Sequence, residues 1–296
     1  CAYSSLRPPI LMWPEIHNII HDLLWEITLR VVIIAIVCFF ELKVNPRMCQ
    51  ITEADLLSHY KLPHNESYIP RSIIVLIVVF LPLIFIFIVF ARTADYVDSI
   101  QAILAWTLAI SITAFITESL KLAVGRPRPD YFYRCFPDGK MTPGLVCTHN
   151  TPEMLNGRKS FPSGHASFSF CSLGFLCLWT WGKLETFSRT RGNSFRSLLC
   201  MTLLGMAGIV AWSRHYDNHH HWGDIFAGTA VGLGSSYFGY CRYYHSLSSE
   251  QTGVPLTTMT ENELFQSLQK ECCSRSLNND VCRLLHLSKK SSAETL

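Results

Sequence analysis

The stretch IIVLIVVFLPLIFIFIVFA, from Ile73 to Ala91, contains nineteen residues, and none of them is charged. At a rise of about 1.5 Å per residue, a helix of this length crosses a hydrocarbon core of roughly 30 Å. Pro82 lies at its centre and is expected to kink the helix, because proline lacks the backbone N–H that the helix needs. The stretch therefore predicts a transmembrane helix.

The composition of the whole chain also favours a membrane protein. Of the 296 residues, 49% are hydrophobic and only 16% are charged, whereas soluble domains carry about 25% charged residues. The formal net charge of +3 is small and no long basic run is present, so we expect no nucleic-acid partner. The twelve cysteines form no C-x-x-C pair, which removes the simplest zinc-binding pattern.

Outward from the first stretch, five further apolar runs are interpreted as membrane spans. They are Leu23 to Phe40, Ile100 to Val124, Phe161 to Trp181, Leu198 to Trp212 and Ile225 to Cys241. In the first of these runs, Glu26 and Arg30 are four residues apart and are expected to form an ion pair on one helix face. The sequence thus predicts an all-α fold, a six-span transmembrane helical bundle at residues 23–242. A short N-terminal segment, 1–22, precedes the bundle and a polar cytosolic tail, 243–296, follows it.

An even number of spans places both ends of the chain on one side of the membrane. The link after the fourth run contains four basic residues and one acidic residue, Lys183, Arg189, Arg191, Arg196 and Glu185. Basic links face the cytosol, so the loops after the first, third and fifth runs are expected on the lumenal or extracellular side. The sequon Asn65-Glu66-Ser67 lies in the first of these loops, where Asn65 is a glycosylation candidate.

Three polar clusters are expected to meet at that lumenal or extracellular face. The first combines Lys121 with Arg128, and the second is the turn Pro162-Ser163-Gly164-His165. The third, Trp212 to Asp224, places Arg214, four histidines and two aspartates between two apolar runs. Arginine binds phosphate with a fixed fork of donors and histidine titrates near neutrality. The mixture is typical of a phosphate-handling site.

The residue types assign roles in a double displacement. Lys121, Arg128 and Arg214 would neutralise phosphoryl oxygens, with the Ser163 hydroxyl and the Gly164 amide as neutral donors, so no metal is required. His220 would attack phosphorus as a neutral imidazole, and Asp224, four residues later, would hold its other ring nitrogen. His165 would protonate the leaving oxygen and then activate water against the phosphohistidine.

The chain resembles the type 2 phosphatidate phosphatases, also called lipid phosphate phosphatases, in three spaced motifs. Lys121 followed after six residues by Arg128-Pro129 matches the first motif, and Pro162-Ser163-Gly164-His165 matches the second. The third contains Ser213-Arg214, then His220 after five residues and Asp224 after three more. The stretch from Gly125 to Phe132, GRPRPDYF, is most similar to the phosphatidate and diacylglycerol pyrophosphate phosphatase branch. The resemblance covers the whole membrane region and implies the same residue roles, with hydrolysis that is independent of magnesium and needs no cofactor.

The expected function is hydrolysis of phosphatidate to diacylglycerol and phosphate, with diacylglycerol pyrophosphate and lysophosphatidate as related substrates. Lipids whose chains stay in the bilayer can present their headgroups to residues at the ends of spans, so the partners expected are lipid substrate and bilayer. The plasma membrane and the endoplasmic reticulum or other endomembranes are both compatible with the pattern. A homo-oligomer remains open. A lipid phosphotransferase and a non-catalytic scaffold are the alternatives, although an intact set of motifs disfavours the scaffold.

For several residues the sequence allows more than one interpretation. The histidines of the tract His219 to His221, together with Asp224, are of the residue types that bind zinc. A zinc site is the less favoured interpretation. Glu118 is expected simply to pair with Lys121. Cys135 and Cys147 share the loop after the third span and could form a disulfide. Gly228 and Gly232 fit close helix packing inside the molecule better than a dimer contact, and Cys272-Cys273 is read as plain tail rather than a lipidation site.

Overall fold

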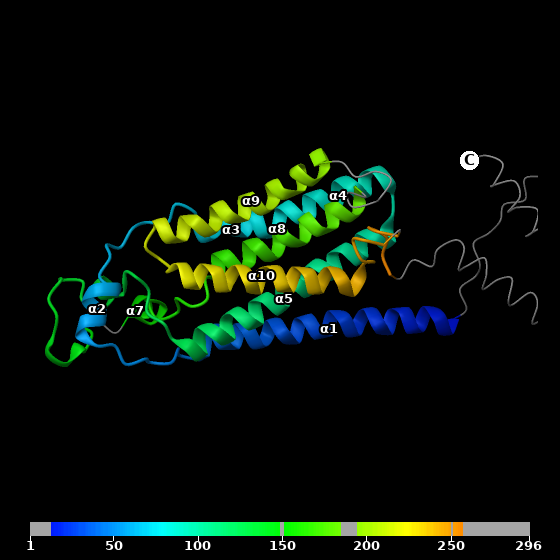
Figure 1. Ribbon diagram of the computed structural model, residues 1–296. Coiled ribbons are helices and arrows are strands. Elements are labelled where there is room, and N and C mark those ends of the chain that lie inside the picture. Colours follow the sequence, from blue (N-terminus) through cyan, green and yellow to red (C-terminus); the bar gives the residue numbers. More distant parts are fainter. Residues whose placement is uncertain (1–12, 149–150, 185–193, 250, 257–296) are drawn as a thin grey trace, which may run out of the picture. The chain divides into compact units, whose positions relative to one another are not determined.

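The computed structural model describes residues 13–148, 151–184, 194–249 and 251–256, and the regular elements in these ranges are helices, as predicted. Long helices form a bundle, and short helices lie beyond one of its ends (Figure 1). The long ones are α1 (Trp13–Lys43), α5 (Tyr96–Val124), α8 (Gly164–Lys183), α9 (Ser194–Tyr216) and α10 (Trp222–Tyr243). A further one is continuous through α3 (Arg71–Val75), η1 (Leu76–Phe80) and α4 (Leu81–Thr93). The short ones are α2 (Glu53–His59), α6 (Tyr131–Cys135), η2 (Pro143–Leu145) and α7 (Pro152–Asn156).

All of these helices belong to one compact unit that ends at Val254. Helix α1 begins at Trp13, ten residues before the predicted start of the first span at Leu23. Pro14 is compatible with this start, because the N–H that proline lacks has no partner in the first turn of a helix. The rest of the expected N-terminal segment, residues 1–12, and most of the expected tail, including Cys272 and Cys273, lie outside the described residues.

Helix α8 lies at the centre of the bundle and contacts α5, α9 and α10. Its side chains Phe175, Leu176 and Trp179 are at most 1% exposed. Helix α10 approaches α8 closely because it presents glycine there, and a Cβ added to Gly228 would stand 2.6 Å from the carbonyl oxygen of Ser163. Gly232 meets the backbone of α8 in the same way. These two glycines therefore serve packing within the molecule, as predicted.

A π-helical turn, η1, directly precedes Pro82 in the second long helix. Proline at this position cannot bond to the carbonyl of Val78, four residues earlier. That carbonyl instead accepts a hydrogen bond of 2.6 Å from the hydroxyl of Ser172 in α8. Trp106 in α5 donates to the same hydroxyl at 3.1 Å. The disturbance expected at Pro82 is thus a local change of helix type, with the freed carbonyl bonded to a neighbouring helix.

A buried arginine in helix α1, Arg30, bonds to α5 and α10. Arg30 forms the predicted ion pair with Glu26, at 2.7 Å. It also donates to the hydroxyl of Tyr243 in α10 at 2.7 Å and to the carbonyl of Leu104 in α5 at 2.8 Å. Every partner accepts a hydrogen bond from the guanidinium, so its charge is well compensated at 7% exposure.

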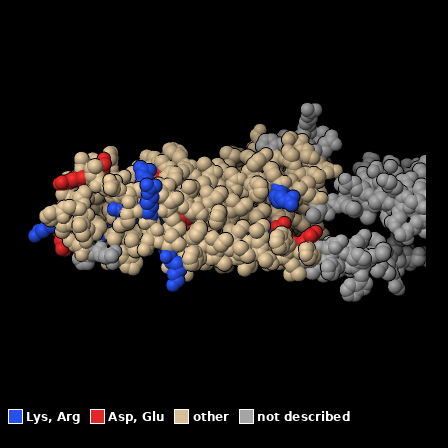
Figure 2. Space-filling model, turned by 90° about the horizontal axis from the view of Figure 1, so that it is seen from below, with Lys and Arg blue, Asp and Glu red and all other residues tan. Residues whose placement is uncertain are grey.

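Four helices in the described residues are long and apolar enough to cross a membrane: His21–Lys43, Arg71–Thr93, Tyr96–Val124 and Ser194–Tyr216. Helices α8 and α10, the other two predicted spans, contain 20 and 22 residues. Both carry many serines and glycines, which suits helices that face other helices rather than lipid. Figure 2 shows a broad, nearly uncharged band on one side of the bundle, between charged residues near its two ends.

The short helices α2, α6, η2 and α7 form a cap with its own small core. Leu56, Phe132 and Phe136 are at most 2% exposed within it. A disulfide joins Cys135 to Cys147 and closes the loop between them. The cap adjoins the ends of the helices that carry the three polar clusters.

Candidate active site

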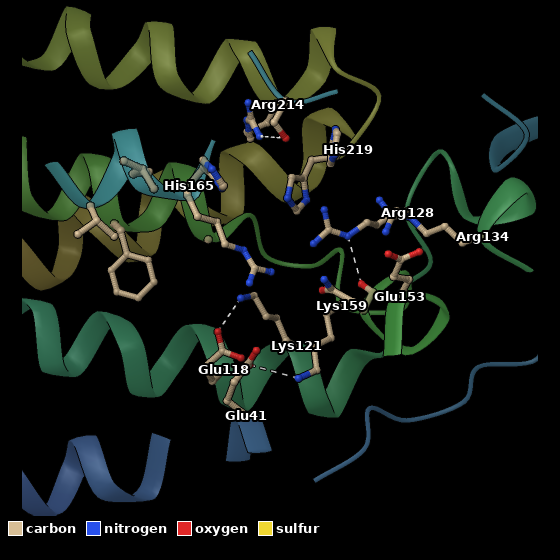
Figure 3. Close-up of a pocket in the computed structure, with 18 of the residues that line it drawn as sticks. Glu41, Glu118, Lys121, Arg128, Arg134, Glu153, Lys159, His165, Arg214 and His219 are labelled. Atoms are coloured by element: carbon tan, nitrogen blue, oxygen red, sulfur yellow. Dashed lines mark hydrogen bonds and ion pairs between the residues drawn. The ribbon is translucent and has the colours of Figure 1, made fainter. Parts of the chain in front are cut away.

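The three polar clusters meet around one cavity of about 1010 Å³ beside the cap. Six of the eight residues assigned to catalysis or phosphate binding line it: Lys121, Arg128, Gly164, His165, Arg214 and His220. In Figure 3, Lys121, Arg128, His165 and Arg214 approach a common space from α5, the loop after it, α8 and α9. Ser163 and Asp224 do not line the cavity and are completely buried behind it.

His220 lies in the turn between α9 and α10, and its ring orientation is fixed by hydrogen bonding. Nδ1 is 2.8 Å from the carbonyl oxygen of Ser160, so the proton of the neutral ring belongs on Nδ1 and Nε2 keeps its lone pair. Burial lowers the pKa of His220 from its ordinary 6.5 to about 3, although the carboxylate of Asp224 acts in the opposite direction. His220 is therefore neutral at physiological pH.

Asp224 acts on His220 mainly through a neighbour. We expected the carboxylate to bond to the His220 ring, but Oδ2 is 3.8 Å from Nδ1. Oδ2 accepts instead from the hydroxyl of Ser160 at 2.6 Å, and Oδ1 accepts from Arg126 at 2.7 Å. Because α10 begins only at Trp222, His220 precedes the helix and does not share a helix face with Asp224. The carboxylate thus fixes Ser160, whose carbonyl fixes the histidine.

His165 is the second residue of α8. Its Nε2 is buried and has no protein partner within the described residues. Ser163, which caps α8, donates its backbone N–H to the carbonyl of Asp224 at 2.9 Å. That N–H is consequently engaged, and the first free donors toward the cavity belong to the turn beginning at Gly164, as expected at a helix N-terminus.

Lys121 projects from the last turn of α5 and lies next to the start of α8, since a Cβ added to Gly164 would be 3.3 Å from its Nζ. It forms the predicted ion pair with Glu118, at 2.6 Å. Glu41 from α1 pairs with Lys159 at 3.2 Å. Two pairs of a lysine and a carboxylate therefore line the cavity. Lys159 was not predicted as a site residue, because it lies three residues before Pro162 and matches no position of the three motifs.

Arg128 reaches the cavity because α5 ends at Gly125, whose left-handed conformation (φ 60°) turns the chain sharply. The Arg128 Nε donates to the carbonyl of Asn156 at 3.2 Å. Burial, together with the nearby positive charge of Arg134, lowers the pKa of Arg128 to about 10, so the side chain stays charged at neutral pH.

Arg214 is only 1% exposed. Its charge is balanced by an ion pair with Asp217, three residues later. Its guanidinium also donates to the hydroxyl of Ser213 at 3.1 Å and to that of Ser67 at 3.2 Å. Neither Asp217 nor Ser67 was predicted to hold Arg214, although Asp217 lies in the same polar stretch.

The suggested zinc set of His219, His220 and Asp224 does not form a ligand group here. Asp224 is engaged by Ser160 and Arg126, and Nδ1 of His220 by a carbonyl. The group in the described residues with metal-ligand spacing is His64, Asp130 and His219, within 4.8 Å of one another. Arg134 already donates to both oxygens of Asp130, at 3.0 and 2.7 Å, which leaves that carboxylate poorly suited to a cation.

The cavity has an apolar end opposite the cations. It is lined by Ile74, Val75, Val78, Val79, Ile110 and Phe168, which come from the second long helix, α5 and α8. A cavity with fixed cations at one end and apolar helix surface at the other can bind a phosphate that is attached to a hydrocarbon chain.

Comparisons with known proteins agree with this chemistry. The sequence model of the PAP2 superfamily matches residues 101–247. Lipid phosphate phosphatase 2 of Arabidopsis thaliana is 38% identical over 229 residues, which cover 76% of this chain and 77% of the relative. Diacylglycerol pyrophosphate phosphatase 1 of Saccharomyces cerevisiae is 35% identical over 162 residues, covering 52% of this chain and 56% of the relative. No solved structure matches the chain significantly.

Proposed function

Since the chain belongs to the PAP2 superfamily, the family of the type 2 phosphatidate phosphatases, we propose that it hydrolyses phosphatidate to diacylglycerol and phosphate. Diacylglycerol pyrophosphate and lysophosphatidate are the further substrates in this proposal. Relatives named lipid phosphate phosphatase and diacylglycerol pyrophosphate phosphatase support phosphatase activity on lipid phosphates. Four helices in the described residues are long and apolar enough to cross a membrane, which supports a location in the bilayer.

One observation carries the proposal. A neutral histidine, His220, and an unpartnered ring nitrogen of His165 border a cavity that also contains three fixed cations and an apolar end. The cations would bind the phosphoryl oxygens, and the apolar end would accept an acyl chain. Charge that develops on phosphorus would meet donors that are already in position.

In the first proposed step, Nε2 of His220 attacks phosphorus, and the bond from phosphorus to the glycerol oxygen breaks. The proton stays on Nδ1, which donates its hydrogen bond to the carbonyl of Ser160 throughout. A protonated His165 then donates its proton to the leaving oxygen. The products are diacylglycerol and a phosphohistidine.

In the second step, the now neutral His165 accepts a proton from water as the water oxygen attacks phosphorus. The nitrogen–phosphorus bond breaks, phosphate leaves, and His220 returns to its neutral form. Lys121, Arg128 and Arg214 compensate the charge on the phosphoryl oxygens in both steps, so the proposed cycle is independent of magnesium.

The membrane arrangement proposed for this reaction has six spans, with α8 and α10 as the two interior ones. The cap and the cavity then face the lumen or the extracellular space, and both termini face the cytosol. The predicted positions in the membrane place Asn65, an exposed residue, on the same side as the cavity, where it would be glycosylated. The plasma membrane and the endomembranes both fit this arrangement.

The direct test is phosphate release by the purified full chain from phosphatidate in mixed micelles. A panel of lysophosphatidate, diacylglycerol pyrophosphate and sphingosine phosphate would rank the headgroups. We expect phosphatidate to be hydrolysed in the presence of excess glycerol without formation of glycerol phosphate. Glycerol phosphate as the main product would assign the chain to the phosphotransferases instead, and no release from any lipid phosphate would contradict the proposed activity.

A further inference from the structure

The segment between α2 and α3, residues 60–70, contacts the surroundings of the cavity at two places although it belongs to none of the motifs. His64 bonds to Asp130, just after Arg128, at 2.6 Å. The backbone N–H of Tyr68 donates to the carboxylate of Asp217 at 3.2 Å. One short segment therefore meets the loop after α5 and the end of α9.

Within this segment, Ser67 makes the contact closest to the proposed chemistry. Its hydroxyl lines the cavity and accepts a hydrogen bond of 3.2 Å from NH1 of Arg214. The other terminal nitrogen, NH2, is held by Asp217 and Ser213. Within the described residues, Ser67 is thus the side chain that accepts from NH1, and the second N–H of NH1 remains for a phosphoryl oxygen.

We propose that Ser67 is a positioning residue for Arg214 and, through it, for the phosphoryl group. The inference rests on the proposed function of the cavity. A guanidinium that is held in place before the substrate arrives loses no rotational freedom on binding, and its charge is aimed at the oxygen where negative charge develops. Without the hydroxyl, Asp217 and Ser213 still hold NH2 and Nε, but NH1 loses its acceptor and is less restrained toward the cavity.

The same hydroxyl belongs to the sequon Asn65-Glu66-Ser67, so a change at Ser67 alone would also remove any glycan. The two effects separate because Asn65 is exposed and outside the cavity lining. Variants of Ser67 are therefore compared in an Asn65→Gln background, in which the glycan is absent throughout. Ser67→Thr and Ser67→Val form a matched pair of similar shape that differs in the hydroxyl, and Ser67→Ala is a third variant with a smaller side chain.

The measurements are kcat and KM for phosphatidate and the inhibition constant of vanadate, which resembles the five-coordinate phosphoryl transition state. Asn65→Gln should retain wild-type values within about twofold. Adding Ser67→Thr should change kcat/KM by less than about threefold, whereas adding Ser67→Val or Ser67→Ala should lower it about tenfold or more and weaken vanadate by a similar factor, as expected for a hydrogen bond to a charged group. In an Arg214→Ala background the Ser67 changes should have no further effect.

Equal kcat/KM and vanadate inhibition for the Thr and Val variants would overturn the inference, as would an undiminished effect of Ser67→Val when Arg214 is already alanine. The proposed function fails differently, by absence of phosphate release from the wild-type chain. If one variant does not fold, the comparison of the remaining hydroxyl-free variant with Ser67→Thr decides the question.

Discussion

At the scale of single residues, the site is built on a histidine that is kept neutral by burial. His220 has a pKa of about 3, so its protonation does not limit the nucleophile between pH 5 and 8. The neighbouring His219 is also buried, which lowers its pKa to about 4. Both residues bind protons in the unfolded chain near pH 6.5 and not in the folded protein, which gives folding a defined dependence on pH.

The expected result is a loss of stability as the pH falls from about 6.5 to 4. In that window the unfolded chain holds more protons than the folded protein, by up to one for His219, which is worth about 1.4 kcal/mol per pH unit. His219→Asn should make the decline shallower over the same window. Thermal unfolding in detergent at several pH values checks this, and equal slopes for the two proteins would argue against a neutral buried His219.

The catalytic roles proposed for His220 and His165 predict large losses of activity when either is removed. Removing a nucleophile or a general acid costs at least about 10² in rate, so His220→Ala and His165→Ala should each lower kcat for phosphatidate by that factor or more. Cys241→Ser, a change at an exposed free cysteine, serves as the control. A loss of less than tenfold in either histidine variant would rule out the assigned roles.

The sequence predicted the cavity-lining cations and histidines because their spacing matches a chemical need. It did not predict how the histidine is held, since the partner of His220 is a backbone carbonyl, of Ser160, that any residue could supply. Nor could spacing reveal Lys159 or Ser67, which reach the cavity only through the folding of distant segments.

At the scale of helices, the contact between the π-helical turn and α8 depends on one hydroxyl. Ser172 satisfies both the carbonyl freed by Pro82 and the indole N–H of Trp106. Ser172→Ala leaves both groups buried without that partner and should lower the free energy of unfolding by about 1 to 3 kcal/mol. Ser111→Ala is the matched control, because its hydroxyl bonds only within its own helix and should cost less.

Unfolding of both variants in detergent by added denaturant compares the two serines directly. If the Ser172 variant is no less stable than the Ser111 variant, the carbonyl of Val78 that Pro82 leaves free does not need a partner from α8.

The positions of the helices were largely predictable from the apolar runs. The helix type at η1 was not, because it depends on the hydroxyl that α8 presents to Val78.

At the scale of the whole molecule, the cations that line the cavity predict hydrolysis without a divalent ion. Lys121, Arg128 and Arg214 are fixed by their own partners within the described residues. Phosphate release should therefore survive an excess of chelator, and vanadate should inhibit it. Activity that chelation abolishes and zinc restores would contradict the proposed mechanism and favour a metal site.

The number of predicted spans indicated that the three polar clusters lie at one end of the bundle, because successive loops alternate between the two sides of the membrane. That number could not predict how closely α8 and α10 pack. Gly228 lets the start of α10 rest on the first turn of α8, so the turn with His220 and the turn with His165 sit on one packed pair of helices. That contact depends on the absence of a side chain at Gly228. The sequence could not predict it, because it does not show which backbone faces this glycine.

The disulfide between Cys135 and Cys147 also bears on where the chain matures. Such bonds form in oxidising surroundings, such as the lumen of the endoplasmic reticulum, and are rare in the reducing cytosol. The bond lies in the cap, beside the cavity, whereas the exposed thiol of Cys241 lies near the opposite end of α10. The thiol chemistry of the two ends thus supports the proposed orientation, in which the cap faces away from the cytosol, and this support is independent of the distribution of charged residues.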